Sequence, residues 1–179
     1  ESYDEVLNSA YPAVEKLKEE GLVDAIGIGV DFVEPLVKFL KADTGFDIFM
    51  LAGRYTLLDT SALNELIPLC LTKGVSLSLA APYNSGILAA GLNDELTTDS
   101  KYWYADVPDE VLNCARSIKA VCDSYQIPLK SVALQFGTAS EVVASTVPGA
   151  RNSHEAKENA EMIGITIPDD LWDETQILV

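Results

Sequence analysis

The chain has 179 residues and is strongly acidic, with a formal net charge of −16 at pH 7 and only 12 lysines and arginines. No basic run offsets this charge, so the sequence disfavours nucleic acids and anionic membrane surfaces as partners, and neither is expected. Although 48% of the residues are hydrophobic, no apolar run approaches the roughly 20 residues that a bilayer-spanning helix needs.

The first half of the chain alternates predicted helices and strands. Residues 4–20 have helical apolar spacing and end at Gly21, which is typical of a glycine C′ residue. Asp31 is a candidate cap for the next helix, which is predicted to run to Leu40. In chain order the remaining predictions are strand 24–30, strand 47–52, a helix over 61–73 that ends at Gly74, and strand 75–81.

The second half continues the pattern after a long connection. Residues 86–107 are predicted to lack regular structure, and loops of this length tend to be functional or disordered. The strands are continuous apolar runs, which is expected of parallel strands covered on both faces. The pattern predicts an α/β fold with helices over 108–125, 129–139, 153–162 and 169–176, and a strand over 142–147.

The connection after strand 142–147 predicts a site for an anion. Pro148-Gly149 breaks the apolar run, and Asn152 or Ser153 can cap the helix that follows. The first N–H groups of a helix have no partner within the helix, so they can bind a phosphate beyond the end of the strand. An ordinary capped connection without a ligand remains the alternative.

This unit, with Glu158-Asn159 after the cap, resembles the last βα unit of the aldo-keto reductases, which are NAD(P)-dependent enzymes built on a (β/α)8 barrel. Other segments fall in family order: GLVDAIGIGV, FDIFMLAGRYTLLD and GVSLSLAAPYNSGILA are similar to the fifth, sixth and seventh barrel strands. The segments GRYTLLD and YNSGILA resemble the sequences of the branch that includes D-threo-aldose, L-fucose and L-galactose 1-dehydrogenases and pyridoxal 4-dehydrogenase.

The resemblance covers the whole chain but only the second half of the family's domain. It implies that residues 1–179 form the carboxyl-terminal half of one (β/α)8 TIM barrel, with four parallel strands and surrounding helices. The family's catalytic Asp, Tyr, Lys and His come from the first half, so the resemblance assigns no catalytic residue here and implies that the N-terminal catalytic half is absent. The expectation is a chain that is inactive alone.

The resemblance also implies the residues that hold the cofactor. NADP-using members carry a Lys and an Arg where Gly149 and Glu155 stand, and a carboxylate suits a ribose hydroxyl better than a phosphate. NAD is therefore expected, while Arg151 leaves NADP possible. The expected cofactor-binding residues are Ser85, Gly86, Leu88, Gly149, Ala150, Arg151, Ser153, Glu155, Glu158 and Asn159.

For the substrate, the resemblance implies a sugar or pyridoxal, whose hemiacetal the parent enzyme would oxidise to a lactone. Tyr102, Trp103 and Tyr104 would roof that pocket through stacking, or alternatively pin their loop to the barrel. One departure from the family is clear. The amide side chains that usually hold the nicotinamide carboxamide are replaced by Gly29-Val30 and Ala52-Gly53.

Other features bear on partners and location. An open four-stranded half barrel would expose strand edges, so a missing N-terminal half or another chain is expected to cover them.

A noncatalytic half-barrel module for binding or assembly is the alternative function, and a different (β/α)8 enzyme is a third. Cys70, Cys114 and Cys122 lack metal-ligand spacing, and no metal site is predicted; they fit a cytoplasmic location.

Overall fold

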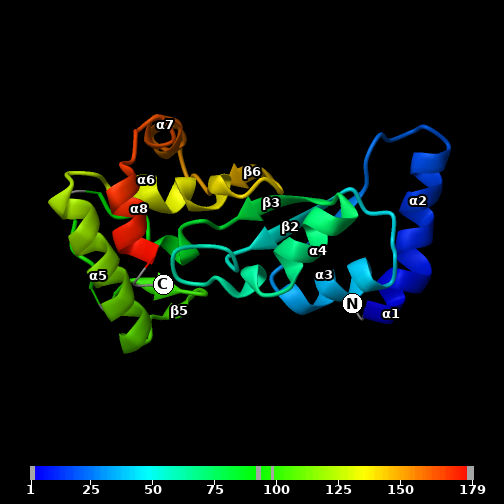
Figure 1. The fold of residues 1–179 in the computed structure, drawn as a ribbon, viewed down its shortest axis with the longest axis horizontal. Coiled ribbons are helices and arrows are strands. Elements are labelled where there is room, and N and C mark those ends of the chain that lie inside the picture. Colours follow the sequence, from blue (N-terminus) through cyan, green and yellow to red (C-terminus); the bar gives the residue numbers. More distant parts are fainter. Residues whose placement is uncertain (1–2, 92–93, 98, 177–179) are drawn as a thin grey trace.

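The computed structural model describes residues 3–91, 94–97 and 99–176. Its centre is a parallel four-stranded sheet in the order β1-β2-β3-β6 (Figure 1). Each strand lies within a predicted range, so the α/β prediction is confirmed. The bounds are β1 Gly27–Val30, β2 Ile48–Ala52, β3 Ser76–Ala80 and β6 Val143–Val147.

The helices also follow the predicted ranges. Figure 1 shows α5, α6 and α8 gathered beyond the carboxyl ends of the strands, with α2 at the opposite end of the molecule. No helix in the described part of the chain is long and apolar enough to cross a membrane. The α-helices are α1 Tyr3–Glu5, α2 Tyr11–Glu19, α3 Val33–Lys41, α4 Leu66–Lys73, α5 Asp109–Ser124, α6 Leu129–Gln135, α7 Ser153–Met162 and α8 Asp169–Gln176; a π-helix, η1, spans Val6–Ala10, and 3₁₀ turns are η2 Ser61–Leu63, η3 Asn84–Gly86 and η4 Phe136–Ala139.

At the end of α2 the glycine prediction is confirmed, whereas at the start of α3 the predicted cap is wrong. Gly21 has φ 70°, and the Leu22 and Gly21 amides donate to the carbonyls of Leu17 and Lys18, which is a Schellman motif. Asp31 does not cap α3, so that expectation was wrong. Phe32 is the residue before the helix and is extended, with φ −129° and no side-chain cap bond.

The connection over 86–107 was expected to lack regular structure. This expectation is wrong, because the connection contains a short antiparallel hairpin. Strands β4 Lys101–Tyr102 and β5 Ala105–Asp106 pair directly. Trp103 and Tyr104 form the two-residue turn with φ of 51° and 61°. Positive φ at both positions matches a type I′ turn, which fits the twist of a hairpin although neither residue is a glycine.

Two apolar clusters hold the fold together, and one face of the sheet stays partly open. On β2, Phe49 and Leu51 are fully buried in the first cluster, under α3 and α4, whereas Met50 between them is 42% exposed. The expectation that both faces are covered is therefore wrong for this strand. The second cluster joins α5, α6 and α8 to the loop after β3 and includes Leu88, Leu112, Ile118, Val132 and Leu171.

Candidate functional site

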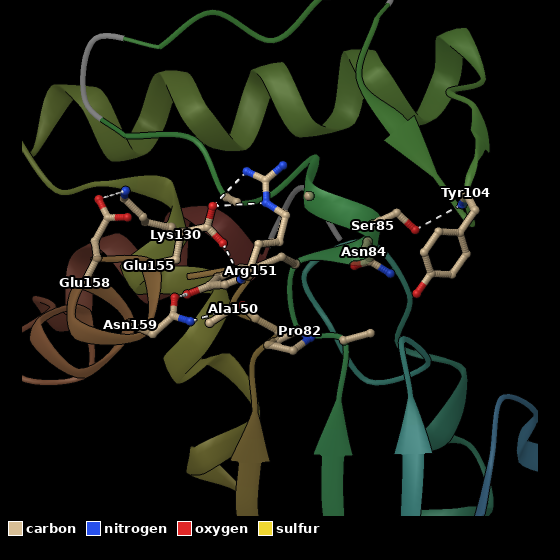
Figure 2. A pocket seen from close by; sticks show the side chains of 15 residues that line it. Pro82, Asn84, Ser85, Tyr104, Lys130, Ala150, Arg151, Glu155, Glu158 and Asn159 are labelled. Carbon is tan, nitrogen blue, oxygen red and sulfur yellow. Dashed lines mark hydrogen bonds and ion pairs between the residues drawn. The ribbon is translucent and has the colours of Figure 1, made fainter. Parts of the chain in front are cut away.

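A pocket of about 650 Å³ lies beyond the carboxyl ends of β3 and β6 (Figure 2). One wall is the loop after β3, and the other is the turn after β6 with the first turns of α7. This is the edge at which α/β proteins bind their ligands. The pocket is lined by Ala81, Pro82, Tyr83, Asn84, Ser85, Gly86, Ala89, Tyr104, Lys130, Gly149, Ala150, Arg151, Glu155, Glu158 and Asn159.

The start of α7 has the predicted cap. Asn152 is extended, and its Oδ1 accepts a hydrogen bond from the Glu155 amide at 3.0 Å. Ser153 is the first residue of α7 and is exposed, but it does not line the pocket. None of the residues of α7 is buried. The helix is therefore attached to the rest of the fold mainly by polar contacts.

Arg151 and Glu155 form an ion pair at the pocket rim. The Arg151 Nε and Nη2 donate to Glu155 Oε1 at 3.0 and 2.8 Å, and the Arg151 amide donates to Oε2 at 2.8 Å. These hydrogen bonds from Arg151 lower the pKa of Glu155 from its ordinary value. The carboxylate is thus ionised at neutral pH, and the guanidinium is already engaged (Figure 2).

Lys130 and Glu158 form a second ion pair, which joins α6 to α7. Its cation is far less exposed than that of the first pair, since the side chain of Lys130 is 13% exposed and that of Arg151 is 90% exposed. Sequence analysis did not select Lys130. Its only signal was a lysine within the otherwise apolar start of a helix, LKSVAL. The two ion pairs together leave the pocket wall with balanced charge.

Tyr83, which sequence analysis also missed, fixes the amide of Asn159. The Tyr83 hydroxyl donates to Asn159 Oδ1 at 2.8 Å, and Asn159 Nδ2 donates to the Gly149 carbonyl at 3.2 Å. Burial, aided by the nearby charge of Glu158, raises the pKa of Tyr83 to about 12. The hydroxyl is therefore protonated and acts as a donor. These two hydrogen bonds connect both walls of the pocket.

The loop after β3 contributes Asn84, Ser85 and Gly86. Ser85 Oγ accepts a hydrogen bond from the Tyr104 amide at 3.1 Å, which anchors the hairpin to this loop. Asn84 is 3% exposed and donates through Nδ2 to the Gly53 carbonyl at 3.3 Å. Sequence analysis did not select Asn84, because a turn asparagine usually serves only the local backbone.

Apart from Tyr104, the remaining predicted residues do not line the pocket. Leu88 is fully buried in the second apolar cluster, and Tyr102 packs against that cluster. The Trp103 ring lies 4.1 Å from the Arg54 guanidinium carbon, in a cation–π contact. Of the three aromatic residues, only Tyr104 lines the pocket, and it is 89% exposed. The hairpin is thus pinned by Tyr102 and Trp103, with Tyr104 left at the rim.

The arrangement suits a ligand with an anionic part and hydroxyl or amide groups. The capped start of α7 favours negative charge, while Glu155 and Asn84 offer oxygen acceptors. A volume of about 650 Å³ lies within the usual range for cofactor pockets. A dinucleotide has this chemistry, so the residues present fit one. Among the described residues, no group of three or more His, Cys, Asp or Glu side chains is placed to hold a metal ion.

Comparison with known proteins establishes the family. The aldo/keto reductase family model matches residues 2–179, and the chain belongs to this family. The chain is 37% identical to a D-threo-aldose 1-dehydrogenase of a Pseudomonas species, over 96% of the chain and 51% of that protein. It is 33% identical to pyridoxal 4-dehydrogenase of Microbacterium luteolum, over 90% of the chain and 46% of that protein.

A solved structure supports the fold. The holo form of an aldo-keto reductase from Bacillus halodurans superposes with a TM-score of 0.76 at 24% identity, over 100% of this chain and 58% of that one. The sheet and its helices therefore share the (β/α)8 barrel fold of the family. The chain spans about half the length of the curated relatives that it matches.

Proposed function

We propose that this chain is the cofactor-holding half of an NAD(P)-dependent oxidoreductase that oxidises an aldose, or the hemiacetal of pyridoxal, to a lactone. The observation that carries the proposal is the pocket beyond β3 and β6. It gathers, from segments far apart in the chain, a helix N-terminus and most of the residues to which the family resemblance assigns cofactor binding. The similarity to an aldose dehydrogenase and a pyridoxal dehydrogenase supports the substrate class.

In this proposal each wall binds a different part of the dinucleotide. The loop at Ser85-Gly86 and the turn at Gly149-Ala150 hold the pyrophosphate, with the α7 N-terminus supplying N–H donors. Glu158 and Asn159 lie at the adenine end. When bound, the nicotinamide would supply the hydride acceptor for the oxidation. Leu88 and Ser153, which do not line the pocket, would act indirectly, through packing and through the start of α7.

We infer that NAD is preferred over NADP. Glu155 is ionised and can accept a hydrogen bond from a ribose 2′-hydroxyl, whereas a 2′-phosphate would meet its negative charge. The Arg151 guanidinium, the nearest cation that could compensate, is bound to the same carboxylate. NADP binding would have to break this pair.

The substrate would lie near Tyr104, the aromatic residue at the exposed rim of the pocket. A ring there can stack on a sugar or a pyridine while its hydroxyl forms hydrogen bonds. Tyr102 and Trp103, which are packed against the rest of the fold, would fix the position of the hairpin that carries this ring. The proton-transfer residues would come from a missing N-terminal half or from another chain, because no position in this sequence matches the family's catalytic residues.

A noncatalytic half-barrel module is the second candidate function. The observation that favours it is the sheet itself, which has β1 and β6 at its edges and exposes Met50 and Val147 to 42% and 44%. Such a surface favours association with more strands. For either function we infer a cytoplasmic location, which suits the buried Cys70 and Cys122 thiols.

Calorimetric titration of the 179-residue chain with NAD and NADP tests the proposal. We expect saturable binding, tighter for NAD, but no NAD reduction with L-fucose, L-galactose, D-arabinose or pyridoxal. Adding the family's N-terminal half in trans should restore turnover. Absence of binding to either dinucleotide would contradict the proposal and favour the noncatalytic module. Turnover by the chain alone would contradict the assignment of proton transfer to another segment.

A further inference from the structure

The loop after β3 has an unusual backbone. Ala81, Asn84 and Ser85 have φ of 53°, 43° and 61°, a region that residues other than glycine seldom adopt. The turn is held by hydrogen bonds from the Asn84 amide to the Ala81 carbonyl at 3.1 Å and from the Gly86 amide to the Tyr83 carbonyl at 2.9 Å. Backbone of this kind persists where the surrounding structure requires it, often at ligand sites.

This backbone turns the Asn84 side chain into the protein, where one of its two polar atoms is left unpaired. Asn84 is 3% exposed and lines the pocket. Within the described part of the chain, its Oδ1 has no hydrogen-bond partner and is buried. The large majority of buried polar side-chain atoms have a partner, so this oxygen is an exception that calls for a cause.

The orientation of the amide follows from its neighbour. Nδ2 lies 3.3 Å from the Gly53 carbonyl oxygen, which can only accept a hydrogen bond. The nitrogen must therefore face Gly53, and the oxygen must face the other way. Figure 2 shows this oxygen on the side toward Arg151 and the pocket interior. Gly53 itself has φ 64°, and a Cβ there would meet the Trp103 ring at 3.2 Å.

The unpaired oxygen gives the pocket two chemically different ends. An amide oxygen pairs with an O–H or N–H group and is repelled by phosphate oxygens, which are also acceptors. The opposite wall presents the N-terminus of α7, where negative charge is favoured. A ligand with phosphates and a neutral donor-bearing end would be bound in one direction only.

We propose that Asn84 Oδ1 accepts a hydrogen bond from an O–H or N–H donor at the nicotinamide riboside end of the dinucleotide, and so fixes its direction in the pocket. The donor is either a hydroxyl of that ribose or the N–H of the carboxamide. This inference rests on the proposed function, but it assigns a role to a residue that neither the sequence pattern nor the comparisons single out.

Asn84→Gly tests the role, because glycine adopts the required φ while the Oδ1 acceptor is lost, together with the Nδ2 bond to the Gly53 carbonyl. NAD, ADP-ribose and ADP are titrated calorimetrically into the chain and into the variant. We expect NAD affinity to fall about tenfold, as for the loss of one hydrogen bond, and ADP affinity to change less than about twofold. Gln126→Gly is the matched control, since Gln126 has φ 59° and is exposed.

The ADP-ribose arm distinguishes the two donors. A loss for both NAD and ADP-ribose supports a ribose hydroxyl, while a loss for NAD alone supports the carboxamide. Equal losses for NAD and ADP, or no loss for NAD, would overturn the proposal. If the unaltered chain binds none of the three ligands, the proposed function is wrong. The titrations of the unaltered chain alone show this outcome, so it is distinct from failure of the Asn84 proposal.

A second measurement needs no variant. The 3-acetylpyridine analogue of NAD replaces the carboxamide N–H₂ with a methyl group. In the unaltered chain, its affinity should be about tenfold below that of NAD if the carboxamide is the donor, and equal to it if the ribose is. An analogue result that assigns a different donor from the ADP-ribose arm would contradict the proposal.

Discussion

The Tyr83 hydroxyl donates to Asn159 Oδ1 at 2.8 Å, and this bond joins the loop after β3 to α7 across 76 residues of sequence. Tyr83 is half-buried, and the bond determines which way the Asn159 amide faces. Because Asn159 in turn donates to the Gly149 carbonyl, one hydroxyl holds the geometry of both pocket walls.

Tyr83→Phe should therefore destabilise the protein by about 1 kcal/mol, the usual net contribution of one such hydrogen bond. Urea unfolding gives this value, and hydrogen exchange of residues 149–152 should become faster. Tyr125→Phe is the control, since its hydroxyl bonds Glu174 at an exposed site, at 2.7 Å. An equal effect of both substitutions would contradict a special role for Tyr83.

Glu155→Arg combined with Gly149→Lys should weaken NAD binding and improve NADP binding. The change places two cations near the ribose 2′ position and releases Arg151 from its carboxylate. A lysine fits at position 149, where a Cβ would have no neighbour within 4 Å. Two charge-assisted contacts, at about 1.5–3 kcal/mol each before desolvation, would shift the preference by roughly one to three orders of magnitude.

Fluorescence titration with both cofactors measures that preference. Glu161→Arg is the control for charge, because Glu161 is on the same helix, pairs only loosely with Lys157, at 3.9 Å, and lies outside the pocket lining. Unchanged relative affinities in the double variant would show that the adenosine ribose lies elsewhere, and Arg151 would be the next residue to test.

Gly27→Ala and Gly29→Ala should differ sharply, although both lie in β1. A Cβ at position 27 would come within 2.2 Å of the Ile48 carbonyl oxygen, whereas at position 29 its nearest atom would be Met50 Cβ at 3.4 Å. We expect Gly27→Ala to cost about 1–3 kcal/mol of unfolding free energy, and Gly29→Ala to be tolerated. Thermal unfolding of the pair is the test; equal midpoints would show that β1 can move away from β2.

Asp47→Asn should reduce stability at neutral pH but not in acid. Asp47 accepts hydrogen bonds from Lys18 Nζ at 2.6 and 2.7 Å and from the Ile26 amide at 2.8 Å, and the bond from Lys18 contributes most to lowering its pKa. A lowered folded-state pKa means that the stabilisation is present above the unfolded-state pKa and disappears as the pH falls through the folded-state value.

The expected loss in this variant is at most about 1 kcal/mol at pH 7, since the pair is partly exposed. It should shrink below about pH 4, where the carboxyl of the unfolded chain takes up a proton before the native one does. Urea unfolding at pH 7 and pH 3 measures both values. Asp106→Asn, at a pair whose carboxylate is 92% exposed, should have a smaller effect. A loss that is the same at both pH values would rule out the carboxylate as its source.

The sequence predicts the parts of this structure that short segments encode. Gly21 ends its helix because its backbone needs positive φ, and Asn152 caps α7 because its side chain reaches an amide three residues on. The pairs Lys130–Glu158 and Tyr83–Asn159 span 28 and 76 residues and could not be predicted from local pattern. Nor does an apolar run such as β2 show what covers each of its faces, which is why the exposure of Met50 was missed.

Helix α7 buries none of its residues, so no apolar core resists its detachment. Elements held mainly by polar contacts open locally at a much lower free energy than the whole domain unfolds. We therefore expect the pocket wall formed by α7 to open at a lower free energy than the wall at the loop after β3. A ligand that bridges the walls binds only the closed form, and its measured affinity is its intrinsic affinity reduced by the fraction of molecules in which α7 is docked.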